Sequence, residues 1–138
     1  MATKEWVGGK SRFGGGVERL PFQSRVEILL QYERRESNAM DVRGNHIIAN
    51  GKREGAEEHY REIVRKANGA YYETPKVQEA VVRNLERVSA IFPEAIDKLG
   101  EVLRVAEQHG QKRLVRLASE ALGRLGSLPA APIGKPPA

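Results

Sequence analysis

Apolar side chains recur every three or four residues along most of the chain after residue 24, and this spacing restricts the possible folds more than any other feature. The clearest run is Val77, Val81, Leu85, Val88 and Phe92. Side chains at that spacing share one face of an α-helix, which completes a turn in about 3.6 residues. Such a stripe has to be covered by other helices, so the sequence predicts an all-α fold, a compact bundle.

The first expected helix runs from residue 24 to about residue 36. Ser24 and Glu27 are spaced as a capping box, in which the hydroxyl accepts a hydrogen bond from the third helical N–H and the glutamate reaches back. Residues 38–53 hold too short an apolar run to be assigned to a strand or a helix. Asn50-Gly51 is a turn signal that could close a small hairpin there. We expect a structured loop over 38–53.

Four further helices are bounded by residue types that begin or end helices. Thr74 and Pro75 suit an N-cap and a first helical position, because threonine accepts an N–H bond and proline lacks an N–H that would have no partner there. Pro93 stops or kinks that helix and can begin the next one. The last two helices are so close in sequence that they must form an antiparallel hairpin. The expected ranges are about 54–68, 74–92, 93–109 and 111–125, which gives about five helices in all.

Two segments of unusual composition flank the expected helical domain, which covers residues 24–126. Residues 1–23 are basic and rich in glycine, and residues 127–138 contain four prolines. Proline has no N–H to donate and favours an extended, polyproline-like backbone. We therefore expect an extended N-terminal arm and an extended C-terminal tail.

The glycine-rich stretch VGGKSRFGGG, residues 7–16, contains the last three letters of a phosphate-binding loop. The full pattern requires a glycine five places before Gly9, where this chain has Lys4, and a buried strand before the loop. We therefore expect no nucleotide site and no small-molecule substrate. As part of a basic arm, Lys10 and Arg12 are candidate contacts to nucleic acid or to a partner chain.

Positive charge is concentrated at the two ends of the chain. The formal net charge is +5; residues 1–26 carry 5 − 2 = +3, residues 111–138 carry 5 − 1 = +4, and the middle is therefore −2. Clustered cations favour a negatively charged partner, most commonly nucleic acid, because binding releases counterions. Solubility alone accounts for the same charge. Both interpretations remain open.

The last expected helix offers the best binding face. Its four cations lie off the apolar stripe, and three of them are expected to project together. Like charges at such spacings repel by a few tenths of a kcal/mol, roughly, which a phosphate would relieve. Surplus arginine is also typical of thermostable helices. The four residues are Lys112, Arg113, Arg116 and Arg124.

Two adjacent aromatic residues, Tyr71 and Tyr72, fall between expected helices. Such rings can stack on nucleobases or on a partner chain. The commoner arrangement places one ring in the core and the other at its rim. We include both tyrosines among the candidate binding residues.

Few residues suggest chemistry. The chain has no cysteine, its three histidines are far apart, and the only aspartates are Asp41 and Asp97. We therefore expect no catalytic residues, no metal site and no cofactor. No apolar run approaches the roughly 18 residues of a membrane span, and the N-terminus has no apolar secretory signal. The expected location is cytoplasmic or within a particle, not secreted.

Two hypotheses for function follow. The first is a non-enzymatic structural or assembly subunit of a larger particle, such as a virion, a ribosome-like body or a guide-RNA complex. Its arms would dock on neighbouring protein subunits or on nucleic acid. The alternative is a free-standing nucleic-acid-binding protein that grips phosphates with its basic last helix and its arms.

Overall fold

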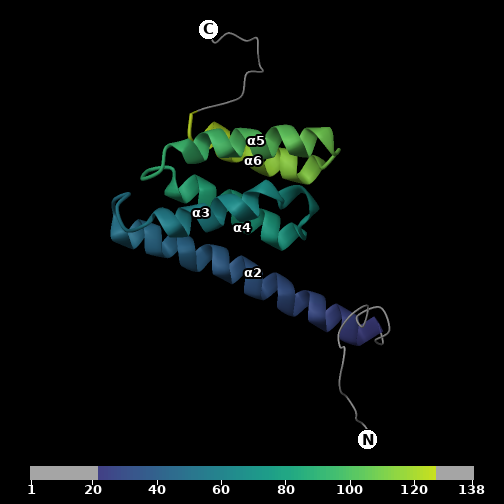
Figure 1. Ribbon diagram of the computed structural model, residues 1–138. Helices are drawn as coiled ribbons and strands as arrows, with labels where there is room; N and C mark the ends of the chain where they lie inside the picture. The colour runs from purple at the N-terminus through teal and green to yellow at the C-terminus, as the bar shows by residue number, and fades with distance from the viewer. Residues whose placement is uncertain (1–21, 127–138) are drawn as a thin grey trace, which may run out of the picture. The chain divides into compact units, whose positions relative to one another are not determined.

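The computed structural model describes residues 22–126 of the 138-residue chain. The predictions of an extended arm and tail, and the candidate residues Lys10 and Arg12, lie outside the described residues. Within residues 22–126 the chain forms five α-helices and one short 3-10 helix, with no strand, so the all-α prediction is confirmed (Figure 1). The elements are α2 (Phe22–Asn50), α3 (Glu57–Asn68), η1 (Ala70–Tyr72), α4 (Pro75–Val88), α5 (Glu94–Gln108) and α6 (Lys112–Arg124).

The chain divides into two compact units between Arg34 and Arg35. In the first unit, the described residues are those of the first half of α2. The second unit contains the second half of α2 and all the helices that follow. In the second unit α3 and α4 form a layer between the end of α2 and the adjacent pair α5 and α6 (Figure 1).

The starts of α4, α5 and α6 follow the sequence signals, but α4 ends at Val88 and not at Phe92, the end that Pro93 predicts. Thr74 caps α4 by accepting a bond from the N–H of Val77 at 3.5 Å, and Pro75 occupies the first turn as expected. Gly110 has a φ of 65°, which a glycine adopts without strain, and it turns the chain between α5 and α6. The predicted helical hairpin at the end of the chain is therefore confirmed.

The predicted loop over residues 38–53 is wrong, because α2 continues unbroken to Asn50. Its buried face in the second unit consists of Ser37, Met40, Gly44 and Ile47. These residues have helical spacing, but a serine and a glycine add no apolar signal to it. The expected N-cap is also misplaced, since Ser24 is the third residue of the helix and not the residue before it. Of the predictions for residues 38–53, only the turn at Asn50-Gly51 is confirmed, because Gly51 has a positive φ directly after the end of α2.

The core of the second unit lies around α4. All five residues of the apolar run from Val77 to Phe92 are buried. The ring of Phe92 stacks on Tyr60 of α3 with centroids 4.4 Å apart. Burial raises the pKa of the Tyr60 hydroxyl to about 12, so this ring stays neutral in the core. The stripe that predicted the fold is therefore the stripe that the bundle covers.

Candidate nucleic-acid interface

Helices α4 and α6 run in the same direction and begin side by side. At the start of α6, Arg113 donates to the carbonyl of Pro75 at 3.4 Å and forms an ion pair with Glu79 of α4. Near the other end of both helices, Arg124 pairs with Glu86 at 2.8 Å. Because residues near the two starts meet and residues near the two ends meet, the N-termini of α4 and α6 lie at the same end of the unit.

A buried amide connects η1 to this end. The Gln78 side chain is only 4% exposed and donates to the carbonyl of Ala70 at 2.9 Å and to the side-chain oxygen of Gln111 at 3.1 Å. Ala70 begins η1, and Gln111 immediately precedes α6. The two tyrosines of η1 are thereby held near the starts of α4 and α6. The sequence predicted the tyrosines and the basic helix separately and gave no reason to place them together.

The aromatic part of this end is a short stack. Tyr71 is half-buried and stacks on His109 with centroids 4.1 Å apart, and Tyr72 meets the edge of Tyr71 at 5.1 Å. Tyr72 is 72% exposed. Its hydroxyl lies over Gly69, where there is no room for a methyl group. Tyr71 is therefore the more covered ring and Tyr72 the more exposed one, which is close to the commoner arrangement, and the aromatic face open to solvent is mainly that of Tyr72.

The charge at this end is positive. The first turns of α4 and α6 contain no acidic residue, and Lys76 and Lys112 are exposed there. Helix N-termini carry a partial positive charge, so a cation in the first turn costs about 0.3–1 kcal/mol that an anion would relieve. Gln111 gives α6 no side-chain cap. We call this surface the Tyr–Lys end and define it as Tyr71, Tyr72, Lys76, Lys112 and Arg113.

The remaining predicted cations are placed differently. Arg113 turns toward Glu79 of α4 and does not project alongside Arg116. Arg116 is exposed and makes a long pair with Glu120 at 3.8 Å on its own helix. Arg124 lies at the opposite end of α6, where the hydrogen bond that it donates to the Glu86 carboxylate raises the pKa of its guanidinium. Of the four basic residues of α6, two therefore belong to the Tyr–Lys end.

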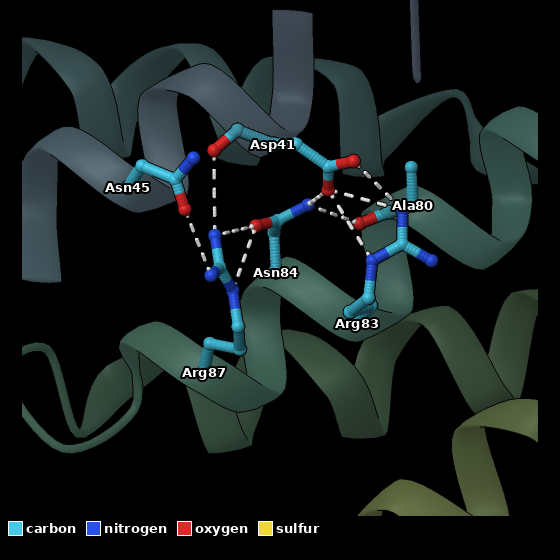
Figure 2. A network of polar contacts seen from close by, with 6 residues as sticks. All are labelled: Asp41, Asn45, Ala80, Arg83, Asn84 and Arg87. Atoms are coloured by element: carbon cyan, nitrogen blue, oxygen red, sulfur yellow. Dashed lines mark hydrogen bonds and ion pairs between the residues drawn. The ribbon is translucent and has the colours of Figure 1, made fainter. Parts of the chain in front are cut away.

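The sequence missed a polar network between the second half of α2 and α4 (Figure 2). The Asn84 side chain is fully buried; its amide donates to Asp41 at 2.8 Å and to the carbonyl of Ala80 at 2.8 Å, and its oxygen accepts from Arg87 at 2.7 Å. Arg83 pairs with the same Asp41 carboxylate at 3.0 Å. Because the Asn84 amide and oxygen both have partners, the network fixes the second half of α2 on α4. The sequence does contain one signal for this network: Asn84 follows Val81 at the spacing of the apolar stripe, where a polar side chain has to find buried partners.

Two histidines distant in sequence also meet. The rings of His46 and His59 are stacked with centroids 4.8 Å apart, and Arg43 lies 3.0 Å from the His59 Nδ1. An arginine beside the pair disfavours a metal cation there. In residues 22–126 no group of three or more histidine, aspartate or glutamate side chains is arranged to hold a metal ion. No helix in the described part of the chain is both long and apolar enough to span a membrane.

Comparisons of this chain with models of known protein families, with curated protein sequences and with solved structures found no match. Among residues 22–126, the features that bear on function are the Tyr–Lys end and the exposed apolar side chains of α2.

Proposed function

We propose that this protein binds single-stranded nucleic acid without catalysing a reaction, and that the Tyr–Lys end is the surface of contact. The observation that supports this most is the Gln78 bridge, because it brings an exposed aromatic pair to the N-termini of two helices that carry cations and no acid in their first turns.

The two halves of this surface suit the two parts of a nucleotide. Phosphates are attracted by Lys76, Lys112 and the helix N-termini, which present backbone N–H groups and a partial positive charge. An unpaired base can stack on Tyr72, a contact worth about 1–3 kcal/mol. A duplex hides its base faces, so we expect single strands to bind more tightly than double strands.

The test is a titration of the full chain into a labelled single-stranded oligonucleotide at several salt concentrations. Lys76 and Lys112, two cations with no ion-pair partner among residues 22–126, predict for a single strand a slope of log K against log salt of about −1.4, or about a sevenfold loss of affinity for a fourfold rise in salt. The double variant Lys76→Ala/Lys112→Ala removes both cations and should weaken binding and flatten the slope.

The matched control is Lys52→Ala/Arg61→Ala, which removes two exposed cations elsewhere in the same unit. Lys52 precedes α3 and η1 follows it, so the 12 residues of α3, about 18 Å, separate Lys52 from η1. Arg61 lies within α3, and the seven residues after it, about 10 Å of helix, separate it from η1. Equal weakening by both double variants would mean general charge attraction with no defined site. Absence of binding at low salt would overturn the proposal outright.

An assembly subunit is the second candidate function, and the exposed apolar side chains of α2 favour it. Phe22, Leu29 and Leu30 are each more than half exposed. A contiguous apolar surface of this kind commonly marks contact with another protein. A subunit of a nucleoprotein particle in the cytoplasm would use both surfaces, with neighbouring subunits on α2 and nucleic acid on the Tyr–Lys end. Sedimentation of the purified chain with and without an oligonucleotide separates the two roles.

A further inference from the structure

The first half of α2 carries an apolar stripe that is largely uncovered. Phe22, Val26 and Leu29 are spaced by four and three residues, with Leu30 beside them, and their side chains share one face of the helix. Phe22 is 70% exposed, Leu29 55% and Leu30 51%. The same spacing recurs in the second half of α2, where the residues are buried: Met40, Gly44 and Ile47. The apolar stripe in the first half of α2 therefore has the spacing of a helix face that packs against another element.

Two charged residues adjoin this stripe, and neither has an ion-pair partner among residues 22–126. The Arg25 Nε is buried without a hydrogen bond, while the guanidinium lies 5.9 Å from the centre of the Phe22 ring. Glu33 continues the helical spacing of the stripe one turn beyond Leu29. A carboxylate on a packing face needs a cation. The Arg25 side chain is half-buried overall, and its terminal guanidinium nitrogens, unlike its Nε, remain open to a carboxylate of another chain.

Arg25 and Glu33 are placed symmetrically about Leu29, Arg25 four residues before it and Glu33 four residues after it. We infer that two copies of this chain pair antiparallel through residues 22–33 of α2, with Leu29 at the twofold axis. Each Arg25 then lies level with Glu33 of the partner subunit, so both unpaired charges are matched at both ends. A parallel pair would place Arg25 beside Arg25 of the partner subunit and is disfavoured. The inference is independent of nucleic-acid binding, since these residues lie outside the Tyr–Lys end.

Charge exchange tests the pairing, with sedimentation velocity of the full chain over a range of concentrations as the measurement. Arg25→Glu and Glu33→Arg should each weaken dimerisation at least about tenfold, and the double variant should restore it. Glu27→Arg is the matched control, because Glu27 lies on a different face of α2 and should leave the dimer unchanged. Circular dichroism verifies that each variant keeps its helix content.

Orientation is tested by thiol cross-linking, which the absence of native cysteine makes specific. Leu29→Cys should cross-link to itself with a short reagent. Phe22→Cys should not, because seven residues on each side of the axis separate the two thiols by about 21 Å along the helices. A chain that stays monomeric at all concentrations, cross-linking at both positions, or failure of the double charge variant to recover would each overturn the inference.

Discussion

Gly44 of α2 lies directly against the side chain of Asn84 of α4, so close that a methyl group at Gly44 would overlap Asn84 and Arg87. Asn84 is fully buried and holds four hydrogen bonds, two as donor and two as acceptor, so it cannot move aside without losing them. The close approach of α2 and α4 and the polar network between them thus depend on each other.

Gly44→Ala should destabilise the protein although alanine is the better helix former. The gain in helix propensity is about 1 kcal/mol, while overpacking a tight contact costs about 1–3 kcal/mol and also disturbs the Asn84 bonds. Gly100→Ala in α5 is the control, because the nearest atom to the added methyl is Arg104 Nη1 at 3.9 Å, an ordinary contact. That variant should be more stable than wild type by about 0.5–1 kcal/mol. Urea unfolding of both measures the contrast, and a stabilised Gly44→Ala would contradict it.

Asn84→Ala should lower the free energy of unfolding by about 2–4 kcal/mol, because Asp41 and Arg87 lose a partner at the α2–α4 contact and a small cavity remains. Asn45, which also bonds Arg87 at 2.9 Å, is exposed, and Asn45→Ala should cost less than about 0.5 kcal/mol. Chemical denaturation gives both values. Similar losses in the two variants would show that burial of Asn84 is not what makes the network important.

The sequence predicted α4 well and α2 poorly for one physical reason. The α4 stripe consists of large apolar residues such as Leu85, whose burial is favourable wherever a covering helix is found. The buried face of α2 includes Ser37 and Gly44, whose value comes only from the shape of the surface they meet. Small and polar residues at helical spacing do not predict a buried helix face until the surface that covers them is known.

For the Tyr–Lys end, the sequence likewise predicted the residues but not that they lie close together. Tyr71, Tyr72, Lys112 and Arg113 were all identified as binding candidates from residue type. What joins them is Gln78, whose two hydrogen bonds reach 8 and 33 residues along the chain. An amide inside a helical stripe carries no signal of its partners, so the juxtaposition had to come from the structure.

Stability should fall below pH 4.5 partly because of Glu36. The hydrogen bond from Lys66, at 2.8 Å, lowers the pKa of this carboxyl below its ordinary value of 4.5. A group with a lowered folded pKa contributes stability that is present above the unfolded value and is lost as pH falls through the folded one. Glu36→Gln should therefore be less stable at pH 7 and lose less on acidification. Thermal unfolding between pH 7 and pH 3 measures this, with Glu107→Gln as a control that removes an exposed carboxylate without an ion-pair partner in residues 22–126. Identical pH profiles for wild type and Glu36→Gln would exclude the Lys66 pair as a source of acid sensitivity.

Tyr72 gives the sharpest test of how nucleic acid would be held. Because the ring is exposed, Tyr72→Ala should change stability by less than about 0.5 kcal/mol. If a base stacks on the ring, the same change should weaken single-strand binding by about 5- to 150-fold, the equivalent of 1–3 kcal/mol per base. Tyr72→Phe keeps the aromatic face and removes only the hydroxyl, so it should bind as wild type does. Fluorescence anisotropy with a short oligonucleotide at constant salt compares the three proteins. If Tyr72→Ala and Tyr72→Phe lose the same affinity, the contact is made by the hydroxyl and not by the ring. If Tyr72→Ala loses no affinity, the ring makes no contact and the cations of α4 and α6 alone hold the strand.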